Sequence, residues 1–265
     1  MKLDILMSCM HQTDASLITK SQITGNAVVI NQCDREDAQE FTTQTGRVRF
    51  LSTTQRGLTK SRNMAIANSD ADVCLLCDDD EIFVPNYEKK ILKTYQELPQ
   101  ADVIIFRMVN YPCSLGGQVR QLKFPHTMHV ASWQISFRRK SLLRTGVRFD
   151  ELLGAGTGNG AEEELKFLVD CQKAGLQIWY APVDIASVAQ EESTWFAGYD
   201  EKFFYNRGAT TRYILGAPLA AAYGIYYVAR KKDMYGDTIT PAKALGAIFR
   251  GIADNKITKQ ARARQ

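Results

Sequence analysis

The chain has 265 residues, of which 45% are hydrophobic and 23% charged, and its formal net charge is +4. This length suits one large domain or one and a half, and the composition is ordinary for a soluble globular protein. The first residues enter a strand at once, so we expect no secretory leader, and six scattered cysteines lack the spacing of a disulfide framework. We therefore expect a cytoplasmic protein, and we expect no nucleic-acid partner.

The first part of the chain alternates apolar runs with polar ends. Residues 3–7, 27–30, 48–51 and 73–77 have the apolar character of buried strands, and 59–68 has helical spacing. Strands that alternate with helices or long loops predict an α/β fold with a mostly parallel, doubly wound sheet and flanking helices. The polar residues that follow these strands should then meet at the carboxyl edge of the sheet, where open α/β sheets bind ligands.

Four consecutive acids, 78–81, follow the strand predicted at 73–77. They cannot be core, because like charges this close repel and the burial of each carboxylate is costly. A hard cation such as Mg²⁺ or Mn²⁺ would resolve both problems, whereas the alternative is a solvated acidic turn. Cys74 and Cys77 should point to opposite faces of this strand, which favours core packing over a zinc or redox pair.

The middle of the chain continues the alternation. A helix is predicted at 87–98, where a proline precedes the periodic residues, and a strand at 101–109. Residues 111–123 contain proline and glycines and are typical of a loop or hairpin. A strand at 131–137 and a short helix at 140–145 follow.

A glycine-rich segment, 154–160, leads into three acids at 162–164, which stand at the start of a predicted helix. Acids are favoured in a first helical turn by the helix dipole, so capping alone could explain them. Gly175 ends this helix. Residues 177–180 should form a strand that Pro182 closes.

The C-terminal part is apolar and basic. Residues 213–229 are apolar apart from tyrosine hydroxyls and are followed by three basic residues at 230–232. This run is short for a membrane span, which favours a pair of interfacial helices. A second amphipathic segment at 241–252 places four apolar residues on one face, namely Leu245, Ile248, Phe249 and Ile252. Such helices suit the inner surface of an anionic membrane, and the alternatives are a helical cap on the sheet or a homodimer contact.

Five elements, in this order along residues 1–195, resemble glycosyltransferase family 2, whose members have the GT-A fold. Each is weak evidence alone, but their order makes the resemblance specific. The elements are Ser8 after the first strand, the segment Asn31-Gln32-Cys33-Asp34, the Gly-x-x-x-x-Arg-Asn element from Gly57 to Arg62 and Asn63, the Asp-x-Asp of Asp78-Asp79-Asp80, and the acid pair Glu163-Glu164 eleven residues before Gly175.

The resemblance implies a catalytic domain over 1–205, with a nucleotide-sugar half at 1–110 and an acceptor half at 111–205. Independently of the resemblance, the apolar and basic pattern of residues 206–265 predicts a C-terminal helical segment that associates with the membrane. The implied reaction is inverting, metal-dependent transfer of a hexosyl group from a nucleotide-diphosphate sugar, with a UDP-sugar expected. The acceptor would be a saccharide or lipid-linked saccharide in bacterial surface polysaccharide synthesis, at the inner face of the plasma membrane.

The resemblance also implies roles for individual residues. Asp80, with help from Asp78, would hold Mn²⁺ or Mg²⁺, and Glu164 or Glu163 would act as the general base. The donor contacts would be Ser8, Asn31, Gln32, Asp34, Gly57, Arg62, Asp78 and Asp79. Glu81 is expected to be a bystander.

Two departures from the family pattern stand out. The acid pair is Glu-Glu rather than Glu-Asp, and Gln190 occupies the position where many relatives have a histidine that can bind the metal. These departures leave open an inactive, membrane-docked subunit that binds a sugar nucleotide. A nucleotidyltransferase is a further alternative, although its glycine-rich phosphate loop is missing because no glycine precedes Gly25.

Overall fold

The computed structural model describes residues 1–112, 114–160, 162–189 and 198–264, and the chain forms two compact units. One unit contains Met1–Phe149 with Glu164–Glu191, and the other contains Asp150–Glu163 with Glu192–Gln265. We call them the sheet unit and the helical unit. The predicted single boundary at residue 205 differs from this division, because the glycine-rich segment before Glu163 belongs to the helical unit.

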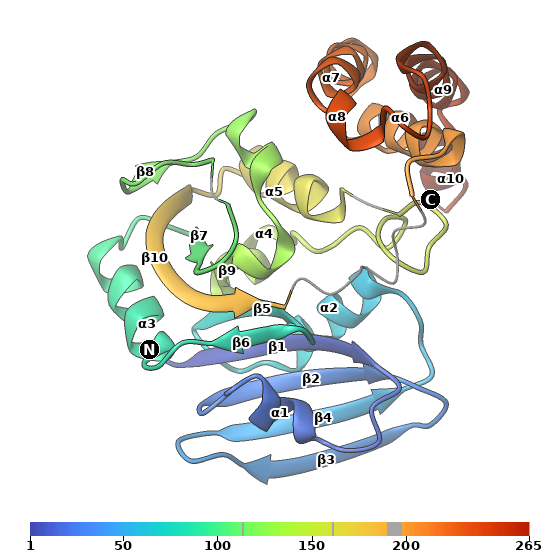
Figure 1. Ribbon diagram of the computed structural model, residues 1–265. Helices are drawn as coiled ribbons and strands as arrows, with labels where there is room; N and C mark the ends of the chain where they lie inside the picture. Colours follow the sequence, from blue (N-terminus) through green and yellow to red (C-terminus); the bar gives the residue numbers. More distant parts are fainter. Residues whose placement is uncertain (113, 161, 190–197, 265) are drawn as a thin grey trace. The chain divides into compact units, whose positions relative to one another are not determined.

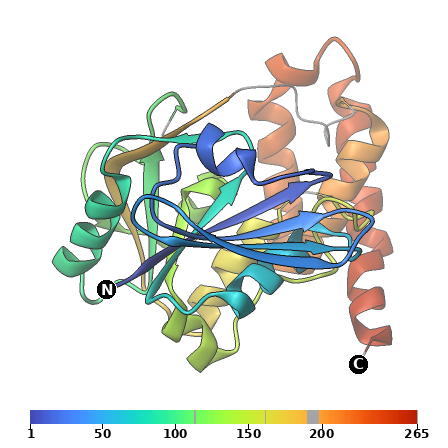
Figure 2. The same ribbon diagram turned by 90° about the horizontal axis from the view of Figure 1, so that it is seen from below.

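The sheet unit is built on one ten-stranded sheet with the order β3-β4-β2-β1-β5-β9-β7-β10-β6, and β8 pairs with β10. Within this sheet, the adjacent strands β4, β2, β1 and β5 run parallel to one another, as predicted, and they lie side by side in Figures 1 and 2. The strands are β1 Leu3–Met10, β2 Asn26–Gln32, β3 Asp37–Thr42, β4 Arg47–Thr53, β5 Val73–Asp78, β6 Glu81–Phe83, β7 Val103–Met108, β8 Arg120–Gln121, β9 Ile135–Arg138 and β10 Ile178–Val188.

Strand β10 does not end at Pro182, so the prediction of a strand closed by this residue is wrong. The strand continues to Val188, and its pairing with β7 shifts register between Tyr180 and Asp184. Proline has no N–H to give to a ladder and is tolerated at bulges. Pro182 lies inside this irregularity and therefore interrupts the ladder without ending the strand.

Helices cover both faces of the sheet, which gives the doubly wound arrangement predicted. Residues of α1 and α3 enter one apolar cluster, and residues of α2, α4 and α5 enter the other. These helices are α1 Ser16–Lys20, α2 Leu58–Asn68, α3 Tyr87–Glu97, α4 Arg139–Thr145 and α5 Glu163–Lys173, and the short helices η1 His126–His129 and η2 Ser132–Gln134 lie between β8 and β9.

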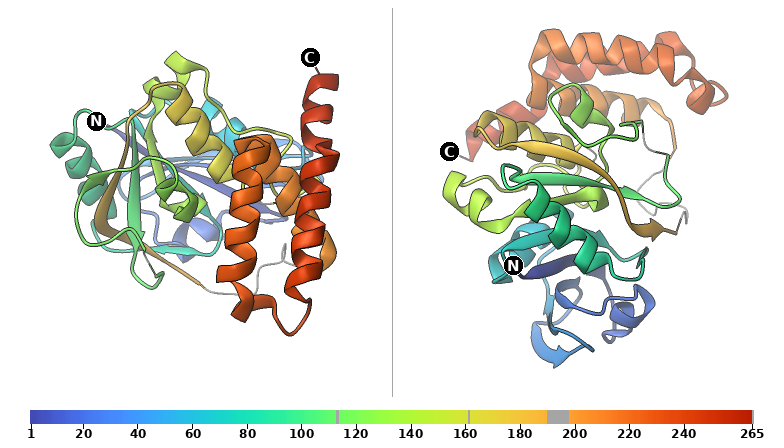
Figure 3. Two further views of the ribbon diagram at one scale, coloured as in Figure 1. Left: turned by 90° about the horizontal axis from the view of Figure 1, so that it is seen from above. Right: turned by 90° about the vertical axis from the view of Figure 1, so that its left-hand side faces the viewer.

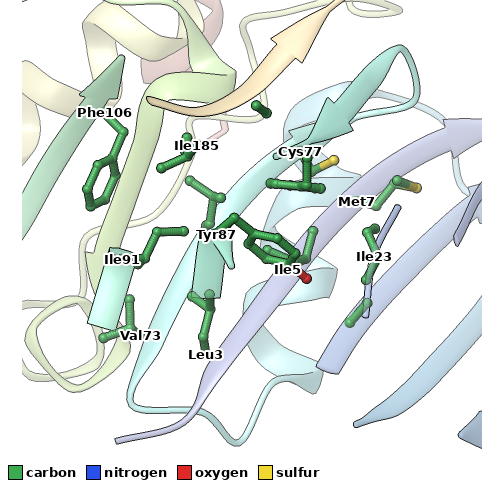
Figure 4. Packing of buried hydrophobic residues seen from close by; sticks show 14 of the residues in the cluster. Leu3, Ile5, Met7, Ile23, Val73, Cys77, Tyr87, Ile91, Phe106 and Ile185 are labelled. Atoms are coloured by element: carbon green, nitrogen blue, oxygen red, sulfur yellow. The ribbon is translucent and has the colours of Figure 1, made fainter. Parts of the chain in front are cut away.

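Alternate residues of the central strands supply the two clusters. Met7 and Cys77 point to the α3 side together with Tyr87 and Ile91, as Figure 4 shows. Cys74 belongs to the opposite cluster. The expectation that the two cysteines of this strand face opposite sides and pack in the core is confirmed.

The helical unit contains α6 Glu201–Leu215, α7 Ala217–Arg230, α8 Lys232–Tyr235, α9 Pro241–Asp254 and α10 Lys256–Ala263. Helices α7 and α9 lie side by side (Figure 3). Glycines allow the closest approach, since a Cβ at Gly208 of α6 would stand 2.1 Å from the carbonyl oxygen of Ile248, and a Cβ at Gly251 of α9 would stand 2.1 Å from that of Tyr205. The apolar run predicted at 213–229 contains the end of α6 and most of α7, and these two helices pack against each other. No helix in the described ranges is both long and apolar enough to cross a membrane.

Candidate functional site

Parallel pairing brings the ends of β1, β2 and β5 to one edge of the sheet. Ser8 of β1 lies opposite Asp78 of β5 on one side and Ile30 of β2 on the other. The Ser8 hydroxyl is buried and accepts a hydrogen bond of 2.8 Å from Ser61 of α2. Ser8 therefore joins the strand that carries the aspartates to the helix that carries Arg62.

Both carboxylate oxygens of Asp78 accept hydrogen bonds from side chains. Its Oδ1 accepts from Nη2 of Arg62 at 3.1 Å, and its Oδ2 accepts from the hydroxyl of Ser132 at 3.2 Å. The Arg62 side chain is only 2% exposed, and its guanidinium lies 5.5 Å from the ring centroid of Phe149. A buried guanidinium requires a charged or hydrogen-bonded partner, so this contact fixes the orientation of Asp78. Ser132, on η2, is a site residue that the sequence did not reveal.

Glu81 is not a bystander, contrary to the prediction. It begins β6 opposite Val188 of β10, its side chain is 1% exposed, and its Oε1 accepts from the Asp78 N–H at 2.6 Å. Its other oxygen, Oε2, is buried and has no hydrogen-bond partner within the described residues. Burial, together with the nearby Asp78 and Asp80 carboxylates, holds the pKa of Glu81 well above its usual range. The chain thus tolerates a costly buried carboxyl group, and that group closes the acidic turn.

The other two aspartates form the turn between β5 and β6. Asp79 is exposed and Asp80 is partly buried, and the Asp80 carbonyl accepts from the N–H of Ala189. No three His, Cys, Asp or Glu side chains gather around one point in the described ranges. Asp78 at the end of β5 and Asp80 on the turn nevertheless offer carboxylate oxygens, which are ligands that fit Mg²⁺ or Mn²⁺, and such ions complete their coordination with water and phosphate oxygens. Gln190, the predicted replacement of a histidine ligand, lies outside the described residues.

Asn31 and Gln32 are buried at the end of β2, and their side chains contact the loop after β1 and the start of α2. The Asn31 side chain is fully buried, and its amide exchanges two hydrogen bonds with the main chain of Gln12, at 2.8 and 2.9 Å. Gln32 is also buried, and its Oε1 accepts from the N–H of Gly57 at 2.8 Å. Gly57 has a φ of +121°, which favours glycine, and it directly precedes α2. These two side chains therefore hold the loop after β1 and the start of α2.

A cavity of about 280 Å³ lies beyond the ends of β1 and β2. Asp34 lines it, as does Arg35, whose guanidinium donates to the carbonyls of Gln12 and Thr13 at 3.4 Å. The exposed Asp34 carboxylate accepts from Arg56 at 2.5 Å. A larger cavity of about 450 Å³ lies at the opposite, amino edge of the strands and contains none of the predicted site residues. Of the predicted site residues, Asp34 lines the smaller cavity.

The second acidic group stands at the start of α5. Strands β10 and β5 point the same way, because β10 is parallel to β7 and both β7 and β5 are antiparallel to β9. Only four residues join Lys173 to Ile178, so α5 runs back against the direction of β10. Its first turn, with Glu164, accordingly lies towards the carboxyl edge of the sheet (Figure 1). Glu163 is buried and belongs to the helical unit, whereas Glu164 is half-buried and belongs to the sheet unit.

Helix α6 holds the segment that leads into these acids. Arg207 donates to the carboxylate of Glu162 and lies 4.2 Å from the ring centroid of Tyr227. Tyr213 donates to Asp150 at 2.6 Å. Glu162 has a φ of +69°, an unusual backbone conformation for this residue. The Arg207 contact therefore fixes a strained residue immediately before Glu163.

Residues 27–151 match the family model described as glycosyl transferase family 2. The range contains the Gly57 to Asn63 element, the three aspartates and Ser132. The matched region belongs to glycosyltransferase family 2. Ser8 and the acid pair of α5 lie outside the matched region, so the match does not bear on them. A sequence search of curated proteins finds no match.

Solved structures resemble the whole chain. Staphylococcus aureus TarS 1–349 in complex with UDP-GlcNAc has a TM-score of 0.64 and 15% identity, over 95% of this chain and 82% of that chain. The same protein in complex with UDP has a TM-score of 0.61 and 13% identity, over 100% and 92%. Mannosyltransferase PcManGT from Pyrobaculum calidifontis, in complex with GDP-Man and Mn²⁺, has a TM-score of 0.52 and 11% identity, over 96% and 86%. With the family 2 match, this likeness shows that the chain has the GT-A fold.

Proposed function

We propose that the protein transfers a hexosyl group from a nucleotide-diphosphate sugar, with a UDP-sugar expected, to a saccharide or lipid-linked saccharide acceptor. The observation that carries this proposal is the arrangement of Arg62, Ser132 and Glu81 around Asp78, inside the family 2 region. The complexes of TarS with UDP-GlcNAc and of PcManGT with GDP-Man support a nucleotide-sugar donor. Synthesis of a bacterial surface polysaccharide in the cytoplasm is the expected setting.

Asp80 and Asp78 are the residues that would hold Mn²⁺ or Mg²⁺. Both oxygens of Asp78 already accept hydrogen bonds, so we assign direct coordination mainly to Asp80 and a supporting role to Asp78. The bound ion would neutralise the diphosphate oxygens as the sugar departs. The Mn²⁺ in the PcManGT complex supports a divalent cation of this kind.

The nucleoside part of the donor would occupy the cavity lined by Asp34 and Arg35. Because Asn31 and Gln32 are buried behind that cavity, we assign them to positioning its walls. The exposed Asp79 would contact the sugar or ribose, and the Gly57 loop would approach the diphosphate. Ser8 and Arg62 would act through Asp78.

The chemical step would be a single displacement with inversion. The acceptor hydroxyl oxygen attacks the anomeric carbon, the bond from this carbon to the β-phosphate oxygen breaks, and the nucleoside diphosphate leaves. A carboxylate takes the hydroxyl proton as general base. We assign this role to Glu164, which belongs to the same unit as the aspartates, and Glu163 is the alternative.

A pair of variants tests the assignment of the base. Glu164→Gln should retain donor affinity and lose about 10²–10⁴-fold in turnover, while Glu163→Gln should retain most of its turnover. Release of the nucleoside diphosphate measures turnover, and calorimetry measures donor affinity. The reverse ranking of the two variants would transfer the role to Glu163. Intact donor binding by the unmodified protein without turnover on any acceptor would favour the inactive, sugar-nucleotide-binding subunit.

A further inference from the structure

Helix α7 exposes an apolar face. A surface helix normally turns its polar residues to water, but every exposed residue of α7 before Arg230 is apolar. Ala220, Gly224, Tyr227 and Val228 form the buried face that packs in the helical unit. The exposed residues recur at intervals of three and four and form one stripe, Pro218, Leu219, Ala222, Ile225, Tyr226 and Ala229. We call it the α7 stripe.

The exposure of its large side chains is substantial. Leu219 is 48% exposed, Ile225 53% and Tyr226 52%, and Met234 on the neighbouring α8 is 52% exposed. Apolar residues that are exposed singly are normal, but a continuous stripe over three helical turns marks an interaction surface. The tyrosine adds an amphipathic ring of the kind favoured at membrane interfaces.

Positive charge accompanies the stripe. Arg230, Lys231 and Lys232 follow it directly, and none of the three forms an ion pair within the part of the chain that the structure describes. Residues 203–232 contain no acid, and residues 199–264 carry twelve Lys and Arg against five Asp and Glu. The remainder of the chain is therefore slightly acidic, since the whole has a net charge of +4.

The other amphipathic helix does not offer such a face. The sequence placed Ile248 and Ile252 of α9 on one apolar face together with Leu245, but Ile248 and Ile252 are buried in the helical unit and Leu245 packs against its core. Only Phe249 of that predicted face is exposed. Of the two segments that the sequence offered as interfacial, α7 therefore keeps an exposed apolar face and α9 does not.

We propose that the α7 stripe with Arg230, Lys231 and Lys232 docks the protein on an anionic lipid bilayer. The apolar side chains would enter the boundary between headgroups and acyl chains, and the basic residues would contact anionic headgroups. Charge complementarity favours an anionic bilayer over a purely apolar partner, because only an anionic surface would gain binding free energy from the three adjacent cations. The docking requires neither donor nor acceptor and is therefore independent of the proposed transferase activity.

Flotation of the full chain with vesicles tests the docking. The unmodified protein should float with phosphatidylcholine vesicles that contain about one third phosphatidylglycerol, and it should float poorly with pure phosphatidylcholine or at high salt. Replacement of the three basic residues by Gln should lower the partition coefficient by about five-fold per charge, or on the order of 100-fold together. Ile225→Glu should abolish flotation, and Leu219→Ser with Ile225→Ser should weaken it.

Leu143→Glu is the matched control, because Leu143 is 56% exposed on α4 of the sheet unit and should not affect flotation. Circular dichroism should show every variant folded, since all substituted residues are exposed. Absence of flotation by the unmodified protein overturns the proposal, and so does equal loss in Leu143→Glu and Ile225→Glu. A dimer that Ile225→Glu dissociates, without vesicle binding, would assign the stripe to a second copy of the chain instead.

Discussion

Glu81 provides a sharp test of how the acidic turn is built, because two substitutions separate its hydrogen bond from its charge. Glu81→Gln keeps an oxygen that can accept from the Asp78 N–H and removes the ionisable group. Glu81→Leu removes the acceptor as well and fills the same buried space with apolar atoms. If Glu81 acts by holding the Asp78 main chain, Gln should preserve function and Leu should not.

The magnitudes follow from burial. Glu81 is 1% exposed and carries a buried oxygen without a hydrogen-bond partner within the described residues, and such a group costs about 1–3 kcal/mol. Glu81→Gln removes the ionisable group but places an amide NH₂ where the unpaired oxygen stood, so a buried polar group without a partner remains and the free energy of unfolding should change by less than about 1 kcal/mol. Glu81→Leu removes the unpaired oxygen but leaves the Asp78 N–H without its acceptor, so its stability should stay near that of the unmodified protein. Residues that support metal ligands typically contribute 10–100-fold to metal affinity, and this is the loss expected for Leu.

Calorimetric titration with Mn²⁺ in the presence of UDP, together with thermal unfolding of the metal-free protein, measures both quantities. Equal loss of Mn²⁺ affinity in Glu81→Gln and Glu81→Leu would refute the reasoning, since the charge and not the acceptor would then matter. Unchanged affinity in both would show that the turn does not depend on Glu81.

Three further predictions concern the metal site, the helical packing and the cysteines. Asp80→Asn should remove the metal dependence of donor binding and lower turnover at least 100-fold, as donor titrations with and without Mg²⁺ would report. Gly208→Ala should lower the free energy of unfolding by about 1–3 kcal/mol, because the added Cβ meets the main chain of α9. The Cβ added by Gly246→Ala lies 3.9 Å from Nη1 of Arg250, an ordinary contact, so this variant should gain about 0.5–1 kcal/mol in urea unfolding. Cys74 and Cys77 should resist alkylation at pH 8 until the protein unfolds, since burial raises the pKa of Cys74 to about 12 and that of Cys77 well above its usual value. Rapid labelling of either native thiol would contradict their core positions.

The parallel part of the sheet and the acid-tipped strand β5 were readable from the sequence, because both rest on local patterns. Apolar runs fix the strands at 3–7, 27–30 and 73–77, and parallel pairing then brings their ends together without further information. The family motif from Gly57 to Asn63 predicted that Arg62 belongs to the site as a donor contact, but its contact with Asp78 was not predicted. The predicted features required no knowledge of distant side chains.

The features that were missed depend on contacts between segments far apart in the chain. Glu81 appeared to belong to a solvated acidic run, but pairing of β6 with β10 draws it into the core. The Asn63 side chain exchanges two hydrogen bonds with the main chain of Phe149, 86 residues away. Pro182 indicated a strand end because the bulge that accommodates it exists only once β7 is alongside. Helical periodicity in 241–252 likewise identified an apolar face but could not show that α6 and α7 cover it.

The measurement that tests the central claim most directly is release of nucleoside diphosphate from UDP-GlcNAc, UDP-glucose and GDP-mannose, each with EDTA and with Mn²⁺ or Mg²⁺ restored. We expect release from at least one donor, dependent on the metal and abolished in Asp80→Asn. Release that is unaffected by EDTA and by Asp80→Asn would contradict a metal site at the aspartate turn. Failure to bind any of the three donors would contradict nucleotide-sugar transfer itself.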